Sequence, residues 1–229
     1  MQLVTVGLQK TTLIDYPDLV ASTVFTHQCN LRCPYCHNPE LVEGPAPETF
    51  IGIEDFFSFL NKRKGVLDGV CITGGEPLVY DNLPGIIKRI QDKGLKVKLD
   101  TNGTFPKKLQ EVFPDYVAMD LKTIPGKYPH YLGGNGSTSA AVIESLEYLK
   151  TGSFDFEIRT TWVPGIIETE DIPELAKLLK GVEKYYITPF RGGVTLDPAW
   201  SGESSPDTAT MKQIQDLFRE QGVSPILRV

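Results

Sequence analysis

Short apolar segments alternate with amphipathic helical patterns along most of this 229-residue chain. Each apolar segment has the length of a buried strand, and each is followed by apolar residues at helical spacing. A repeated β-then-α order predicts a parallel sheet with right-handed crossovers. The six predicted strands cover residues 21–26, 68–73, 95–99, 116–121, 154–162 and 184–188.

Six βα units are fewer than the eight of a closed barrel. The alternation alone fits either a partial barrel, open on one side, or an open doubly wound sheet. A last helix is predicted over about residues 207–221. Because the chain has no linker, low-complexity run or internal repeat, we expect a single domain over residues 1–229.

The first predicted strand runs into a loop, residues 27–38, that holds three of the four cysteines. Cys29, Cys33 and Cys36 are separated by three and then two residues, so a compact loop can direct three thiolates at one metal centre. Three sulfurs suit a 4Fe–4S cluster with one open iron. A zinc site that adds His37 is the alternative, although adjacent ligands rarely complete a tetrahedron. Disulfides are disfavoured because we expect no secretory signal.

The cysteine spacing, with Tyr35 before the last cysteine, resembles the signature of the radical S-adenosylmethionine (SAM) superfamily. The run Cys-Pro-Tyr-Cys-His-Asn at 33–38 is similar to that of the activating enzymes of glycyl radical enzymes. Residues 7–17, Gly-Leu-Gln-Lys-Thr-Thr-Leu-Ile-Asp-Tyr-Pro, resemble anaerobic ribonucleoside-triphosphate reductase activating proteins. The resemblance implies an α/β fold, a partial (βα)6 TIM-like barrel of the radical SAM type. It also implies two cofactors, a 4Fe–4S cluster held by three cysteines and SAM.

A Thr-Gly-Gly-Glu-Pro turn, residues 73–77, follows the second predicted strand. Gly74 and Gly75 let the backbone approach a ligand closely, and Glu76 can accept a charge-assisted hydrogen bond from an ammonium group. By resemblance, this turn binds the methionyl amino group of SAM. The alternative is a tight turn that is closed by Pro77.

Two aspartates end the third and fourth predicted strands, in Asp-Thr-Asn-Gly at 100–103 and Asp-Leu-Lys at 120–122. The resemblance links Asp100 and Asp120 to a monovalent cation beside the SAM carboxylate, and Lys122 to SAM. Carboxylates grouped together repel one another unless a cation intervenes. The alternatives are a β-turn at Asn102 and a surface ion pair for Asp120 and Lys122.

Arg159 lies within the fifth predicted strand, where an unpaired charge is costly to bury. It resembles a strand arginine near SAM, and an internal salt bridge is the alternative. The fourth cysteine, Cys71, is expected to be a small buried core residue, and residues 130–137 a solvated loop. The resemblance implies no catalytic side chain beyond the cluster and SAM. The predicted cofactor-binding residues are Tyr35, Asn38, Gly74, Gly75, Glu76, Asp100, Asn102, Asp120, Lys122 and Arg159.

The implied reaction is reductive cleavage of SAM to a 5′-deoxyadenosyl radical, which takes a hydrogen atom from a glycine of a partner enzyme. The expected partner is a glycyl radical enzyme, first of all anaerobic ribonucleotide reductase, and the expected electron donor is a flavodoxin or a ferredoxin. Activation of pyruvate formate-lyase or of another glycyl radical enzyme, a small-molecule radical SAM reaction and simple electron transfer are the alternatives.

The net charge of −6 argues against a nucleic-acid partner, which needs a positive footprint. No apolar run reaches the roughly 20 residues that span a bilayer, so no membrane partner is expected. A cytoplasmic location is the default expectation, and a reducing compartment suits an exposed cluster.

Overall fold

The computed structural model describes residues 1–152 and 155–228. The chain forms two compact units. The first consists of Met1–Asn30, Glu40–Thr101 and Lys107–Ala118, and the second of Leu31–Pro39, Asn102–Pro106 and Met119–Val229. The prediction of a single domain stays a prediction.

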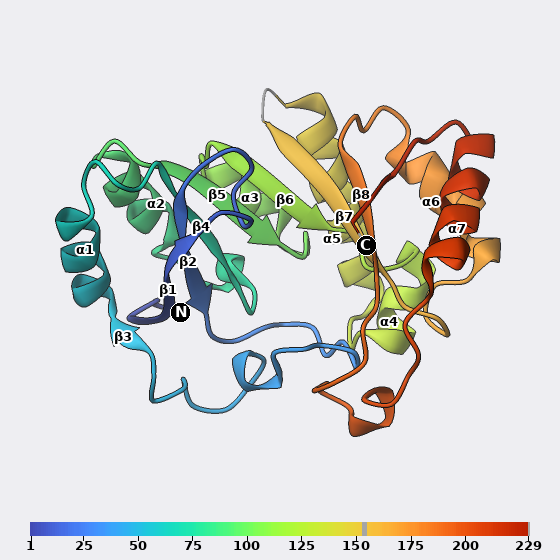
Figure 1. The fold of residues 1–229 in the computed structure, drawn as a ribbon, viewed down its shortest axis with the longest axis horizontal. Helices are drawn as coiled ribbons and strands as arrows, with labels where there is room; N and C mark the ends of the chain where they lie inside the picture. The colour runs from blue at the N-terminus through green and yellow to red at the C-terminus, as the bar shows by residue number, and fades with distance from the viewer. Residues whose placement is uncertain (153–154, 229) are drawn as a thin grey trace. The chain divides into compact units, whose positions relative to one another are not determined.

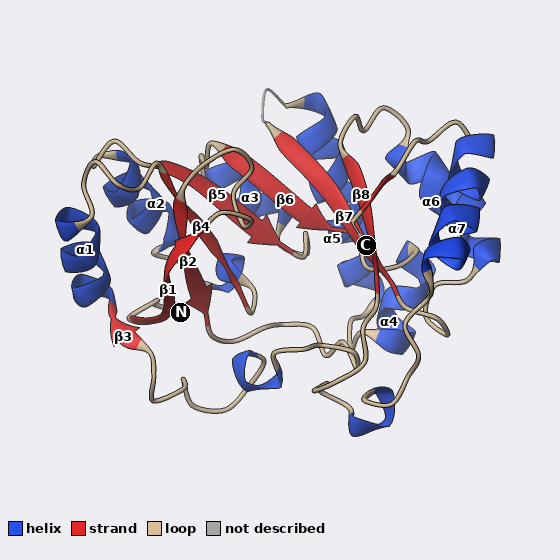
Figure 2. Ribbon diagram, viewed as in Figure 1, coloured by secondary structure: helices blue, strands red, loops and turns tan. Residues whose placement is uncertain are grey.

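The first unit is built on a mixed sheet with the strand order β3-β1-β2-β4-β5-β6 (Figures 1 and 2). β2 pairs in parallel with β4, and β4 with β5, whereas β1 is antiparallel to both β2 and β3. The last two residues of β6 belong to the second unit. The bounds are β1 (Thr5–Thr12), β2 (Ala21–Thr26), β3 (Ile51–Gly52), β4 (Gly69–Gly74), β5 (Lys96–Thr101) and β6 (Tyr116–Asp120).

Two amphipathic helices cover this sheet, α1 (Ile53–Lys62) and α2 (Leu83–Gln91). α1 packs on β1 and β3 through Phe56, Phe57 and Leu60, and α2 packs on β5. Burial of such apolar faces is the main stabilising contribution to a layered α/β fold. The remaining helical segments are η1 (Pro39–Leu41), η2 (Pro77–Val79) and α3 (Pro106–Glu111).

The second unit continues from β6 with the order β6-β7-β8-β9, and β7, β8 and β9 pair in parallel. Here β7 is Phe156–Trp162, β8 is Tyr185–Pro189 and β9 is Ile226–Leu227. The α-helices are α4 (Tyr128–Tyr131), α5 (Gly136–Thr151), α6 (Ile172–Leu179) and α7 (Thr208–Glu220). α6 and α7 pack on each other, and α7 also packs on β9. The short 3-10 helices are η3 (Pro125–Lys127), η4 (Thr169–Asp171) and η5 (Pro198–Trp200).

The six predicted strands are β2, β4, β5, β6, β7 and β8, and their described ends agree with the prediction to within two residues. The predicted start of the fifth strand, at Phe154, lies outside the described residues. The predicted last helix is α7, which Asp207 caps by accepting the N–H of Thr210. The fold is therefore α/β with a mostly parallel sheet, as predicted. In the described part of the chain, no helix is long and apolar enough to cross a membrane.

Candidate functional site

In the first unit, the Gly-Gly turn after β4 lies against the backbone that leads to Cys29. A Cβ on Gly75 would be 2.0 Å from the carbonyl oxygen of Gln28, and one on Gly74 would be 2.5 Å from the backbone nitrogen of Thr26. Gly74 also has a φ of +109°, which side chains rarely permit. The structure therefore explains both glycines by a close approach to the chain's own backbone. Their predicted contact with SAM stays a prediction.

The turn also holds the residue before the first cysteine in an unusual conformation. Gln28 has a φ of 72°, which is uncommon for a residue other than glycine. Its carbonyl accepts the N–H of Glu76 at 2.8 Å, and the carbonyl of Thr26 accepts the N–H of Gly75 at 2.8 Å. The N–H of Cys29 then bonds to the carbonyl of Val42 at 3.1 Å. Together these bonds fix the direction in which the chain enters the cysteine loop.

Glu76 is fully buried, and its carboxylate accepts hydrogen bonds from neighbouring residues of the first unit. Its Oε1 accepts hydrogen bonds from the hydroxyl of Thr101 at 2.8 Å and from the N–H of Leu78 at 3.0 Å. The second bond caps η2, as expected for an acidic residue at a helix N-terminus. The structure thus gives Glu76 a structural role beside the predicted contact with the SAM amino group.

A buried charged group lies at the C-terminal half of β5. Lys98 and Asp100 are two residues apart on one strand, so both side chains point to the same face. The ammonium of Lys98 donates to Oδ1 of Asp100. Cys71, the β4 residue in register with Lys98, has its sulfur 3.8 Å from both groups. Cys71 is buried, as predicted, but it borders an ion pair instead of purely apolar neighbours.

In the second unit, the cysteine loop is closed by its own backbone and by the segment before η5. The N–H of Cys36 bonds to the carbonyl of Cys33 at 3.0 Å. The carbonyls of Pro34 and Cys36 accept the N–H groups of Asp197 and Leu196, each at 2.9 Å. The peptide around Cys33 and Cys36 is thus held by a segment that lies about 160 residues away along the chain.

The hydroxyl of Tyr35 is buried and has no hydrogen-bond partner among the described residues. Burial raises the pKa of Tyr35 well above its usual value, and charge on Cys33 raises the pKa further, so the hydroxyl remains a donor. In the first unit, Nε2 of buried His27 likewise has no partner in the described part of the chain. Buried polar groups are nearly always paired. Each of these atoms belongs to the cysteine loop, and each fits contact with a polar group that the protein binds.

His37 follows the last cysteine, and its ring is held by two contacts of the second unit. Its Nε2 bonds to the carbonyl of Arg191 at 2.6 Å, so this nitrogen carries the proton. Its ring stacks on Phe190 with centroids 5.5 Å apart and an interplanar angle of 7°. The imidazole is oriented by these two contacts and does not need a metal ion to place it.

Asp120, at the end of β6, pairs with two cations of the second unit. Nε of Arg159 donates to Oδ1 at 2.8 Å, and Nζ of Lys122 lies 3.3 Å from Oδ2. Burial would raise the pKa of Asp120, but Arg159 and Lys122 lower this pKa from 3.8 to about 2. Burial would also lower the pKa of Lys122, yet Asp120 raises it well above its usual value. All three groups therefore stay charged near neutral pH.

The remaining predicted residues have simpler surroundings. Oδ1 of Asn102 accepts the N–H of Thr104 at 3.0 Å and its hydroxyl at 2.6 Å, a local side-chain contact, and its predicted contact with SAM stays a prediction. Asn38 is exposed. The expectation of a solvated loop at 130–137 is only partly correct, because the segment begins in α4, ends in α5 and buries Leu132. Asn135 caps α5 in a capping box with Thr138. The carbonyl of Leu132, in the same loop, accepts the N–H of Arg32 at 2.8 Å and so supports the cysteine loop.

All four cysteines are thiols, not disulfides. In the described part of the chain, no three His, Cys, Asp or Glu side chains are already arranged as a metal site, so the three cluster ligands stay a prediction from their spacing. Their chemistry fits the prediction, because thiolates are the usual ligands of iron–sulfur clusters.

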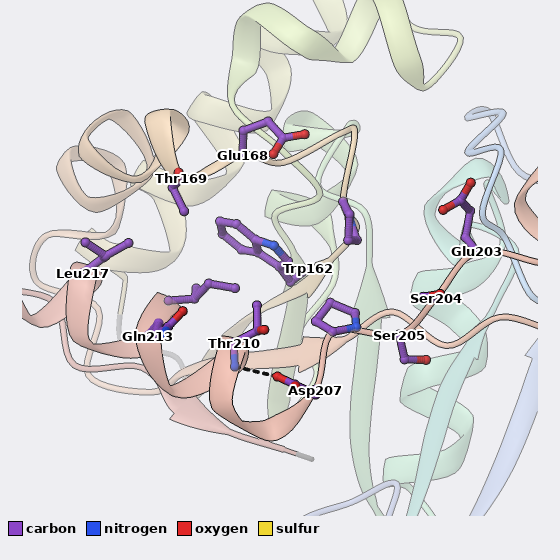
Figure 3. A pocket seen from close by; sticks show the side chains of 13 residues that line it. Trp162, Glu168, Thr169, Glu203, Ser204, Ser205, Asp207, Thr210, Gln213 and Leu217 are labelled. Carbon is purple, nitrogen blue, oxygen red and sulfur yellow. Dashed lines mark hydrogen bonds between the residues drawn. The ribbon is translucent and has the colours of Figure 1, made fainter.

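A cavity of about 580 Å³ lies in the second unit, where β7 ends near the start of α7 (Figure 3). Trp162 forms one wall, and Asp207, whose carboxylate accepts the N–H of Thr210 at 2.7 Å, lies near another. All the predicted cofactor residues are described, and none of them lines this cavity, although Trp162 shares β7 with Arg159.

Sequence reasoning did not identify Lys98, which pairs with Asp100, or Gln28, which precedes the first cysteine, as residues of the candidate functional site. The alternation in Lys96-Val97-Lys98-Leu99-Asp100 already places Lys98 on the face of Asp100, so this signal was available. The left-handed conformation of Gln28 has no sequence signal, because glutamine has no preference for it.

Comparison with known proteins gives a family. The model of the radical SAM superfamily matches residues 23–179. A protein of Methanocaldococcus jannaschii that is provisionally named a glycyl-radical enzyme activating enzyme is 28% identical, over 100% of this chain and 97% of its own. A pyruvate formate-lyase-activating enzyme of Staphylococcus aureus is 26% identical, over 89% of this chain and 90% of its own.

Solved structures support the fold. The crystal structure of QueE from Escherichia coli superposes with a TM-score of 0.62 and 15% identity, and covers 99% of this chain and 94% of that one. The family match spans the cysteine loop, the Gly-Gly turn and the ends of β5, β6 and β7, which together carry every predicted cofactor residue. The chain therefore belongs to the radical SAM superfamily.

Proposed function

We propose that this radical SAM enzyme is an activase that generates a glycyl radical on a partner enzyme. The observation that carries the proposal is the similarity over nearly the full length of both chains to a protein provisionally named a glycyl-radical enzyme activating enzyme. QueE from Escherichia coli, which shares the fold, is less similar in sequence, at 15% identity. Cys29, Cys33 and Cys36 would hold the 4Fe–4S cluster, which would supply one electron for the cleavage of SAM.

The chain's own residues orient and shield this chemistry. The Gly-Gly turn fixes Gln28 and with it the backbone of Cys29. The buried hydroxyl of Tyr35, which has no partner among the described residues, is available as a donor to a bound polar group. Arg159 and Lys122 keep Asp120 ionised, so that a carboxylate of fixed charge stands at the end of β6. The proposal includes no metal ion at Asp100, whose carboxylate already has the ammonium of Lys98.

For the partner, we propose anaerobic ribonucleoside-triphosphate reductase. The basis is the run at residues 7–17 and the Cys-Pro-Tyr-Cys-His-Asn run at 33–38. Pyruvate formate-lyase is the second candidate, because an activating enzyme of that name is 26% identical over most of this chain. A flavodoxin or a ferredoxin is the proposed electron donor.

The test is an anaerobic activation assay with the reconstituted protein, SAM and a reductant. Each candidate partner is supplied in turn, beside a variant of it whose radical-bearing glycine is replaced by alanine. The proposal predicts a glycyl-radical doublet in electron paramagnetic resonance with the reductase, and none with the alanine variant. A doublet with pyruvate formate-lyase alone would change the partner. Rapid SAM cleavage that requires a metabolite and no protein would contradict the activase function.

A further inference from the structure

Lys98 is the central residue of a charged group inside the first unit. Its side chain is 3% exposed and its partner, the carboxylate of Asp100, is 13% exposed. A buried ammonium is costly unless an anion pairs with it, and the described contacts give it Asp100. The negative charge of Asp100 is therefore compensated by the Lys98 ammonium without any bound ligand.

The sheet register explains why Lys98 occupies this position. Lys98 and Cys71 are directly opposite on two adjacent parallel strands, and the sulfur of Cys71 is 3.8 Å from the ammonium. The same sulfur is 3.8 Å from Oδ1 of Asp100, so Cys71 contacts both members of the ion pair. The ion pair is therefore built from three neighbouring positions of the sheet, and not from a flexible surface side chain.

A metal ion at Asp100 does not fit these contacts. A monovalent cation beside a carboxylate competes with any other positive charge that this carboxylate already contacts. At Asp100 the nearest oxygen accepts the Lys98 ammonium, and a second positive charge beside that ammonium would be repelled. In the second unit, the carboxylate of Asp120 pairs with two cationic side chains, Arg159 and Lys122.

We propose that Lys98 takes the place of a bound monovalent cation at Asp100, and that SAM binding by this chain requires neither Na⁺ nor K⁺. Lys98 is then a positioning residue, which holds the Asp100 carboxylate and supplies the positive charge at the end of β5. This inference deepens the proposed function and rests on it for the identity of the ligand.

The experiment measures SAM affinity of the anaerobically reconstituted protein by equilibrium dialysis. The chloride salts of Na⁺, K⁺ and tetramethylammonium are compared at one ionic strength, since tetramethylammonium is too large for a carboxylate site. The expected result is one dissociation constant, within about twofold, in all three salts. A second readout is the ²³Na line width, which should not broaden when the wild-type protein is added.

Lys98→Met removes the internal cation that pairs with Asp100. We expect SAM affinity to fall by roughly tenfold or more in tetramethylammonium, the loss of one charge-assisted contact, and to recover in Na⁺ or K⁺. Lys98→Arg should stay independent of the salt. Lys96→Met is the matched control, because it makes the same charge change at an exposed position of the same strand.

Wild-type affinity that falls tenfold in tetramethylammonium would overturn the proposal, and so would an equal loss in all three salts for Lys98→Met. If Lys98→Met does not fold, the proposal is tested by the two wild-type measurements, the SAM dissociation constants in the three salts and the ²³Na line width. SAM binding needs no partner enzyme. Salt-independent binding without a glycyl radical would therefore refute the activase function and leave this inference standing.

Discussion

Gly75→Ala tests whether the Gly-Gly turn holds the entrance to the cysteine loop. The added Cβ would lie 2.0 Å from the oxygen and 2.7 Å from the carbon of the Gln28 carbonyl, and both are backbone atoms that cannot rotate away. The backbones at Gly75 and Gln28 must separate by more than 1 Å to reach an ordinary contact, which breaks the 2.8 Å bond from the N–H of Glu76. Overpacking costs about 1–3 kcal/mol, and the lost hydrogen bond adds about 1 kcal/mol.

We therefore expect the free energy of unfolding to fall by roughly 2–4 kcal/mol, measured by chemical denaturation. Iron content after reconstitution should also fall, because Gln28 precedes the predicted ligand Cys29. The control is Gly85→Ala on the exposed side of α2, where a Cβ meets nothing within 4 Å. Gly85→Ala should stabilise the protein by about 0.5–1 kcal/mol. If Gly75→Ala is as stable as this control and binds as much iron, the turn does not hold the entrance to the cysteine loop.

Three further predictions concern the second unit and Cys71. Asp120→Asn should lower the stability at pH 7 by at most roughly 2 kcal/mol, an upper bound because Asp120 is 32% exposed. The difference in stability between wild type and Asp120→Asn is complete above the unfolded pKa of about 3.9 and falls as pH approaches the folded pKa of about 2. A difference that persists unchanged at pH 3 in denaturation curves would contradict this prediction. Asn135→Ala removes the acceptor for the N–H groups of Ser137 and Thr138 and should cost about 1 kcal/mol in thermal unfolding, and no change would mean that α5 does not depend on this cap. Cys71→Ala should retain a full complement of iron, and loss of iron would make Cys71 a ligand.

The parallel strands of the sheet are predictable because each is a short apolar run followed by a helical pattern. β1 is not, because Gln9, Lys10 and Thr11 are successive exposed residues that break the alternation of a half-buried strand. β3 and β9 have two residues each, too few for any periodic pattern. The sequence therefore does not predict the antiparallel strand β1 or the two-residue strands β3 and β9 at the edges of the sheet.

The functional residues divide in the same way. The cysteine spacing and the Gly-Gly-Glu-Pro turn are local, and local patterns identified the superfamily. The reason for two glycines at 74 and 75 is not local, because it depends on Thr26 and Gln28, which approach only in the folded sheet. Arg159 likewise reaches Asp120 from 39 residues away along the chain, whereas Lys98, the partner of Asp100, is two residues away on the same strand and follows from the local alternation.

The most direct test of the central claim is low-temperature electron paramagnetic resonance on the anaerobically reconstituted and reduced protein, with and without SAM. We predict the signal of a reduced 4Fe–4S cluster that changes shape when SAM is added, because SAM would occupy an iron without a protein ligand. A cluster signal that is indifferent to SAM, or bound zinc with no iron, would contradict the proposed chemistry.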